Sequence, residues 1–278
     1  MDIQIQSIQW SQLPLENDLD YYKIFFTELG MTYSVDQVNY RAPAFSAIFL
    51  APHQHFLVIA NPDKRLELTQ VLFNGDYYCI ELHKHDVACN GLLFNTVYQL
   101  PHVELSASVF EELLQLCQKM ILIMSRESKF SNAILKSYLQ LILALTSDEK
   151  QKYIDQHSYF KQLTNIDGII FQELVEQNYK VEKSISFYAS AMNMTAGALS
   201  KRIKKTLQKS PSKIIQERTI LEAKKLLHLT YKSIKEIANE LYFEDQHYFS
   251  RYFKNTVGIS PLRYREQVGI SEVANLSQ

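Results

Sequence analysis

The sequence predicts an α+β protein with a β-barrel in its N-terminal part, flanking helices, and an all-α C-terminal part. Three observations lead to this prediction. Short segments typical of strands fill the first 105 residues, apolar residues adopt helical spacing from about residue 106, and residues 181–265 contain an internal repeat. The chain has 278 residues, of which 46% are hydrophobic and 21% charged. This composition excludes a disordered chain, and the length suffices for two domains.

Residues 1–105 contain short β-branched or aromatic segments separated by turn residues. Several short strands at this spacing predict a barrel or a sandwich. Three predicted strands are Phe45–Leu50, Phe56–Ile59 and Tyr77–Ile80, and the turns contain Ala51-Pro52, Asn61-Pro62-Asp63 and Asn74-Gly75-Asp76.

Residues 106–172 are predicted to be helical. Ser108 and Glu111 have the spacing of a capping box, in which each side chain satisfies a main-chain N–H group at a helix start. Ser147-Asp148 is expected to cap a third helix. The first predicted helix has an apolar stripe that either pairs two chains or packs on its own barrel. The stripe of the first helix contains Leu113, Leu116, Met120, Ile123 and Met124. A second helix is predicted from the helical spacing of Ile134, Leu135, Tyr138, Leu139, Ile142 and Leu145.

Charge is divided unequally along the chain, although the net charge is only −1. From Lys180 to Gln278 there are 17 Lys+Arg and 9 Asp+Glu, a net charge of +8. This leaves 12 of the 29 basic and 21 of the 30 acidic residues for residues 1–179, a net charge of −9. A basic third most often faces a polyanion, and nucleic acid is the leading example. A basic face that is only solvated is the alternative.

The repeat predicts two copies of a short helix, a tight turn and a longer basic helix. Its matching pairs are Ser184-Ile185 with Ser233-Ile234 and Ala189 with Ala238, at an offset of 49, and Ser210-Pro211 with Ser260-Pro261, at an offset of 50. Order, spacing and chemistry agree in both copies. The pattern is that of two helix-turn-helix units.

The longer helices are predicted at about 196–207 and 246–256. Thr195 is expected to cap the first, and Glu244 or Asp245 the second. In the second copy, the short helix begins with a capping box of Ser233 and Glu236. The residues expected to be buried are Leu199, Ile203, Phe249 and Phe253.

The outward faces of these helices have side chains that suit DNA. A helix fits the major groove, where Arg or Lys can donate to guanine and Gln can pair with adenine. Basic residues further along would hold phosphates, here Lys204, Lys205 and Lys254. The other outward residues are Gly197, Ser200, Lys201, Gln246, His247, Ser250 and Arg251. A solvated face is the alternative, and two basic copies in tandem favour DNA.

Residues 181–265 resemble the DNA-binding domain of the AraC family of bacterial transcription regulators. The resemblance rests on Ser233–Ala238, Phe243–Lys254, Gly258–Pro261 and Tyr264-Arg265, with Arg218–Leu227 similar to the family's connecting helix. It implies that residues 173–268 form two helix-turn-helix units that read successive major grooves. The base-reading positions would be Ser200, Lys201, Gln246, His247, Ser250 and Arg251, and also Gly197.

Two residues depart from the family's pattern. Tyr242 occupies a turn position where the family usually has Gly, and a positive φ there would cost a tyrosine about 1 kcal/mol. Asn193, its counterpart in the first copy, tolerates that conformation better. Gln208 stands where the second copy has a glycine. Because Gly197 has no side chain, the first unit is expected to read fewer bases than the second.

Residues 20–105 resemble, more loosely, the cupin-like sensor barrel of many such regulators, through Tyr21–Val35, Ala51–His55 and Cys89–Phe94. The resemblance implies a domain that binds a small effector or supports dimerisation. The histidine pairs His53/His55 and His83/His85 allow an alternative, a cupin-type metal-dependent enzyme fused to a DNA-anchoring module. The next acid after His55 is Asp63, which is too distant for a metal-ligand set. We therefore predict no metal, no cofactor and no catalytic residue.

The sequence thus predicts a sequence-specific transcription regulator that is not an enzyme. Expected partners are double-stranded promoter DNA, RNA polymerase, a second copy of the chain and a small effector, although a barrel that only dimerises fits equally well. The opposite charges of the two parts also suggest that residues 1–179 hold the basic part off DNA.

The protein is expected to be cytoplasmic and not membrane-bound. The N-terminus has no signal-peptide pattern, and apolar runs such as Ala47–Ala51 are too short to span a bilayer. The cysteines, Cys79, Cys89 and Cys117, are too few for a disulfide framework and are expected to be free thiols. Residues 269–278 are predicted to be a flexible tail.

Overall fold

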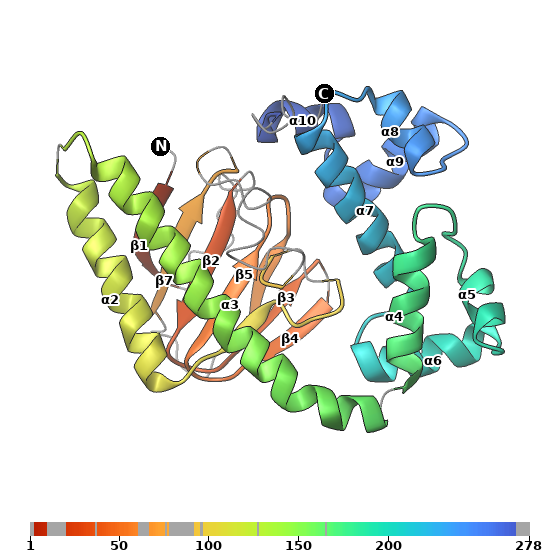
Figure 1. The fold of residues 1–278 in the computed structure, drawn as a ribbon, viewed down its shortest axis with the longest axis horizontal. Coiled ribbons are helices and arrows are strands. Elements are labelled where there is room, and N and C mark those ends of the chain that lie inside the picture. The colour runs from red at the N-terminus through yellow and green to blue at the C-terminus, as the bar shows by residue number, and fades with distance from the viewer. Residues whose placement is uncertain are drawn as a thin grey trace. The chain divides into compact units, whose positions relative to one another are not determined.

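The computed structural model describes residues 3–9, 21–36, 38–60, 67–75, 77, 92–94, 97–126, 128–164 and 166–270. The chain divides into two compact units. The N-terminal unit contains Met1–Thr96 and Leu100–Ile154, and the C-terminal unit contains Val97–Gln99 and Asp155–Gln278. Figure 1 shows the strands in the first unit and a succession of helices in the second.

The N-terminal unit contains two antiparallel sheets, with strand orders β1-β7-β2-β5-β8 and β4-β3-β6. The strands are β1 (Ile3–Gln9), β2 (Tyr22–Thr27), β3 (Met31–Val35), β4 (Val38–Ala42), β5 (Ser46–Leu50), β6 (Phe56–Ala60), β7 (Glu67–Phe73) and β8 (His102–Glu104). The predicted strands at 45–50 and 56–59 are confirmed by β5 and β6, whereas 78–80 lie outside the described residues. The combination of sheets and helices confirms the α+β class. The described strands form no closed barrel, so the cupin-like barrel stays a prediction.

A buried core fills the space between the two sheets. Phe25 of β2 stacks on Phe56 of β6 with ring centroids 5.0 Å apart. The hydroxyl of Tyr33 in β3 is 2.7 Å from Nδ1 of His102 in β8. Each contact joins one sheet to the other, and all four residues are buried. Successive residues of a strand point to opposite faces, so the neighbours of Phe25 must be covered by something else.

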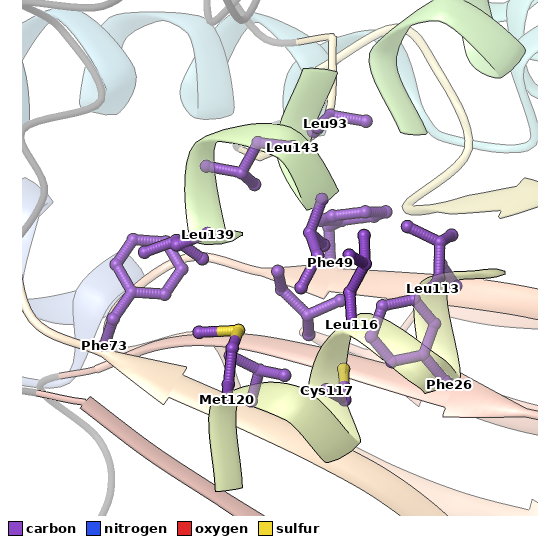
Figure 2. Close-up of a cluster of buried hydrophobic side chains, with 14 of the residues drawn as sticks. Phe26, Phe49, Phe73, Leu93, Leu113, Leu116, Cys117, Met120, Leu139 and Leu143 are labelled. Atoms are coloured by element: carbon purple, nitrogen blue, oxygen red, sulfur yellow. The ribbon is translucent and has the colours of Figure 1, made fainter. Parts of the chain in front are cut away.

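Two helices supply that cover, α2 (Ala107–Met124) and α3 (Ser131–Thr164). Figure 2 shows Leu113, Leu116 and Met120 of α2 beside the sheet, in one cluster of buried side chains with Phe26 and Phe49. Burial of each such side chain contributes roughly 1.5–3 kcal/mol. The apolar stripe of the first predicted helix therefore packs on its own chain's sheet.

Two predicted helix starts in this region are wrong. Ser106, not Ser108, caps α2, because its hydroxyl accepts the N–H of Val109 at 3.3 Å. Helix α3 continues through Ser147-Asp148, where a new cap was expected. The helix accommodates the buried Thr146 just before this position, because the Thr146 hydroxyl donates to the carbonyl of Ile142, one turn earlier, at 2.7 Å. Ile134, predicted to be on the apolar stripe, is 40% exposed.

The C-terminal unit is helical. Its helices are α4 (Ile166–Asn178), α5 (Ile185–Ala191), α6 (Ala196–Leu207), α7 (Pro211–Leu229), α8 (Ile234–Glu240), α9 (Gln246–Val257) and α10 (Pro261–Val268). Helices α6 and α9 confirm the two longer basic helices predicted at 196–207 and 246–256. The region 106–172 is shared between the units, because α2 and most of α3 belong to the first and α4 to the second. No helix in the described ranges is both long and apolar enough to cross a membrane.

Candidate nucleic-acid interface

Helices α5 and α6 form the first helix-turn-helix unit. The hydroxyl of Ser184 caps α5, and that of Thr195 caps α6 by accepting the N–H of Ala198 at 3.2 Å. The turn between the helices is closed by a bond from the N–H of Met194 to the carbonyl of Ala189 at 2.8 Å. The predicted cap at Thr195 is confirmed.

Helices α8 and α9 form the second unit with the same construction. Ser233 and Glu236 make the predicted capping box, in which the Glu236 carboxylate accepts the N–H of Ser233 at 2.7 Å. The turn is closed from the N–H of Phe243 to the carbonyl of Ala238 at 2.9 Å. This bond lies 49 residues after the corresponding bond of the first unit, so the sequence repeat is also a structural repeat.

Of the two predicted capping residues, Glu244 and Asp245, it is Asp245 that caps α9. Its Oδ1 accepts the N–H groups of His247 at 2.6 Å and Tyr248 at 2.8 Å. These bonds, that of Tyr248 foremost, together with the charges of His247 and Arg251, lower the pKa of the Asp245 carboxyl below its usual value. The start of α9 therefore has an ionised carboxylate at neutral pH.

Each unit buries the residues expected from its spacing. Leu199 and Ile203 of α6, and Phe249 and Phe253 of α9, have no exposed surface. Helix α7 contributes to both clusters, with Ile214 and Ile215 in the first and Ala223 and Leu227 in the second. The predicted connecting helix therefore packs on both units.

The outward face of α9 displays a row of polar side chains. His247, Arg251 and Lys254 follow one another at intervals of four and three residues, so they lie on one face of the helix. All three are exposed, as is Gln246, whereas Ser250 is half-buried. The structure thus brings the predicted base-reading and phosphate-binding residues of the second unit together on one surface.

The outward face of α6 has the same layout with different side chains. Fifty residues before the row on α9 stand Gly197, Lys201 and Lys204, which are exposed, and Lys205 is exposed as well. Ser200 is half-buried like Ser250. A Cβ added at Gly197 would meet no atom within 4 Å, so the position is open space on this surface.

The basic residues on the outward faces of α6 and α9 differ from neighbouring basic residues in whether they form ion pairs. Arg202, on another side of α6, pairs with Asp167 of α4 at 2.7 Å. Within the described part of the chain, no ion pair involves the five cations of the outward faces, which are Lys201, Lys204, Lys205, Arg251 and Lys254. Their charges are therefore available to an external anion.

The histidines considered as metal ligands do not form a site in the described structure. His53 is buried in a turn, and His55 is exposed just before β6. His83 and His85 lie outside the described residues. No group of three or more His, Cys, Asp or Glu side chains with the geometry of a metal site occurs in the described part. The thiol of Cys117 is free, and burial raises its pKa to about 12.

Sequence reasoning missed the turn between α4 and α5, residues 179–183. Lys183 donates to the carbonyl of Leu241, 58 residues further along the chain, at 2.7 Å. A contact over such a distance leaves no periodic pattern in a single sequence. The only signal is that two lysines, Lys180 and Lys183, flank a segment that immediately precedes the first unit.

Known proteins share the C-terminal unit. Residues 188–267 match the family model of a helix-turn-helix domain. RafR of Pediococcus pentosaceus, a raffinose operon transcriptional regulatory protein, is 29% identical over 96 residues, which are 34% of this chain and 35% of RafR. YfiF of Bacillus subtilis (strain 168), an uncharacterised HTH-type transcriptional regulator, is 31% identical over 138 residues, 50% of this chain and 42% of YfiF.

The chain thus spans about a third to two fifths of the length of these relatives. Among solved structures, the C-terminal domain of AraT, a response regulator from Geobacillus stearothermophilus, has 30% sequence identity and a TM-score of 0.36, covering 39% of this chain and 89% of AraT's domain. Residues 188–267 are a helix-turn-helix domain of the AraC type. The relatives are regulators of transcription, in agreement with the prediction of a protein that is not an enzyme.

Proposed function

We propose that the protein is a sequence-specific DNA-binding regulator of transcription that reads two successive major grooves with α6 and α9. The observation that carries this proposal is the repeated exposed face, on which Lys201 and Arg251 occupy equal positions. Lys204 and Lys254 are likewise equivalent, and none of the four is neutralised by an ion pair of the described residues. A single basic helix can be a solvated face, whereas two equivalent ones match two turns of DNA.

The roles within each face follow from side-chain chemistry. Arg251 and Lys201 would donate to guanine, Gln246 would pair with adenine, and His247, Ser200 and Ser250 would contact neighbouring base edges. Lys204, Lys205 and Lys254, further along the helices, would bind phosphates. Gly197 can offer no side chain to a base, so the second unit would carry more of the specificity.

The N-terminal unit would control this activity, through a small effector or through dimerisation. If two chains pair, they use a surface other than Leu113, Leu116 and Met120, because these residues are buried within the unit. Recruitment or exclusion of RNA polymerase at a promoter in the cytoplasm would be the output.

Selection of bound sequences from a random duplex pool tests the proposal. The full-length protein is used at physiological salt, and the expected result is a motif with two elements about one helical turn apart. A duplicated motif would indicate a dimer. The measured affinity should fall steeply with salt, since several phosphates release counterions on binding.

A double variant, Lys201→Ala with Arg251→Ala, should lose the motif. Lys119→Ala, which removes a charge from the exposed side of α2, serves as the matched control and should select the wild-type motif. Absence of any enriched sequence, both for the full-length protein and for residues 155–278, would contradict the proposal.

A further inference from the structure

The turn between α4 and α5, residues 179–183, contacts the second helix-turn-helix unit although it immediately precedes the first. The ammonium group of Lys183 donates to the carbonyl of Lys180 at 2.7 Å and to that of Leu241 at 2.7 Å. It also lies 4.7 Å from the centre of the Phe243 ring. Leu241 and Phe243 flank Tyr242 in the turn between α8 and α9. One side chain therefore holds both sides of the second unit's turn.

The character of these bonds makes Lys183 a positioning group and not a solvated charge. Partial burial lowers its pKa to about 8, which reflects the cost of removing an ammonium group from water. Carbonyl oxygens and an aromatic face offset that cost. A hydrogen bond from a charged donor in such surroundings is stronger than one between neutral groups.

The neighbouring residues of the turn contact α7 and α8. The ammonium group of Lys180 is 3.7 Å from a carboxylate oxygen of Glu222 in α7 and 3.7 Å from one of Glu240 in α8. At these distances and with partial exposure each pair is weak by itself. Together the two pairs place the Lys180 cation between the connecting helix α7 and helix α8 of the second helix-turn-helix unit.

Tyr179 anchors the start of the turn on α7. The guanidinium of Arg218 lies 3.7 Å from the centre of the Tyr179 ring. The Thr219 hydroxyl, which donates to the carbonyl of Ile215 at 2.9 Å, is also 3.4 Å from the Tyr179 carbonyl oxygen. Arg218 in turn binds both carboxylate oxygens of Glu176 in α4, at 2.8 and 2.9 Å. Helices α4 and α7 are thus clamped together at the base of the turn.

We propose that the 179–183 turn, through Lys183, fixes the distance and rotation between α6 and α9 and thereby sets the spacing of the two DNA elements that the protein accepts. The inference rests on the proposed function. Helix α7 also packs on both units, and the turn adds a second connection between them. Insertion of one base pair moves the second element by about 3.4 Å and rotates it by about 35°, so only a rigid connection rejects the altered site.

The first test compares Lys183→Met with the wild-type full chain on three duplexes. These contain the selected two-element site, the same site with one base pair inserted between the elements, and one element alone. Lys183→Met should lower the ratio of affinities for the first two duplexes by about tenfold, the effect of one charged hydrogen bond. Affinity for the single element should not change. Lys183→Arg, which keeps the positive charge, should have the wild-type ratio. Lys235→Met, on the exposed side of α8, is the matched control and should also have the wild-type ratio.

The second test needs no DNA. Spin labels are attached at Lys205 of α6 and Asn255 of α9, which are equivalent exposed positions, through noncanonical amino acids that leave the cysteines unlabelled. Pulsed electron paramagnetic resonance then gives the distribution of distances between the two labels. Lys183→Met should broaden this distribution, whereas Lys183→Arg should keep the wild-type width.

The outcomes separate this inference from the proposed function. An unchanged distance distribution and an unchanged affinity ratio in folded Lys183→Met would overturn the role of the turn, even if the protein binds its site. If Lys183→Met broadens the distance distribution but the wild-type protein selects no DNA sequence, the positioning role of Lys183 is supported and the proposed reading of DNA is rejected. If Lys183→Met does not fold, Lys180→Met, which changes a 38% exposed side chain, is used in both tests. The same direction of change is expected, with an effect smaller than tenfold because its ion pairs are weak.

Discussion

Asn193 and Tyr242 have the same left-handed backbone conformation, with φ of 53° and 54°, at equivalent positions of the two repeats. Each N–H group donates to the carbonyl three residues earlier, that of Ser190 or Asn239, at 3.0 Å. The turn geometry therefore requires a positive φ in both units. Asparagine tolerates it, whereas tyrosine is strained there.

Tyr242→Gly should raise the free energy of unfolding of the C-terminal unit by up to about 1 kcal/mol. Relief of strain amounts to about 1–2 kcal/mol, and the greater freedom of glycine in the unfolded chain offsets part of it. The tyrosine side chain is 65% exposed, so its removal costs little packing. Urea unfolding followed by circular dichroism measures the change. Asn193→Gly is the control and should change stability less; a destabilised Tyr242→Gly would contradict this account of the turn.

The ends of the two long helices provide a second comparison. Gln208 and Gly258 are the C-caps of α6 and α9, with φ of 59° and 91°. Because glycine has no Cβ, it adopts this conformation without strain. Gln208→Gly should therefore stabilise, and Gly258→Gln should destabilise, each by about 1 kcal/mol. Thermal unfolding of the two variants should shift in opposite directions, and shifts of the same sign would rule out this explanation.

Arg251→Ala and Lys254→Ala should weaken DNA binding in different ways. Loss of a two-pronged contact to guanine by Arg251→Ala should cost about 1–3 kcal/mol and relax the preference at one base pair. Lys254→Ala should weaken all sequences alike and reduce the salt dependence by about one phosphate. Titrations with the selected site and with its single-base variants measure both effects. If Arg251→Ala leaves affinity and base preference intact, α9 reads DNA with another residue.

Lys150 should make the stability of the N-terminal unit depend on pH. Its ammonium group is buried in α3, where it donates to the carbonyl of Leu100 at 2.7 Å, and burial lowers its pKa to about 7. Burial foremost, and then the charge of Lys150, lower the pKa of His102 to about 4. Above pH 7 the folded lysine has released a proton that the unfolded chain retains until about pH 10.5.

The free energy of unfolding should therefore rise between pH 7 and pH 9, by at most about 1.4 kcal/mol per pH unit from this group. Lys183, whose pKa is lowered to about 8, gives the stability of the C-terminal unit a pH dependence of the same sign. The measured quantity is consequently the difference in slope between the wild type and Lys150→Met, obtained from urea unfolding at each pH. Equal slopes would mean that Lys150 keeps its proton in the folded state.

The sequence by itself determined the features that depend on short spacings. The repeat, the caps at Thr195 and Ser233, and the burial of Phe249 and Phe253 follow from local hydrogen bonding and from the period of the helix, so they could be predicted. The positive φ of Tyr242 could be suspected from the resemblance to the AraC family, which usually has Gly at that position. Prediction failed at Ser108, because Ser106 supplies the same type of hydroxyl two residues earlier.

The tertiary structure alone decided which surfaces meet. The stripe on α2 could have paired two chains or covered a sheet. The sheet face with Phe26 and Phe49 determined the outcome, because it would be exposed to water without α2. The connection from Lys183 to Leu241 spans 58 residues, and its energy depends on burial that no local pattern records. A single sequence specifies each helix-turn-helix unit through neighbouring residues, whereas the contacts that join the two units form only when distant segments pack together.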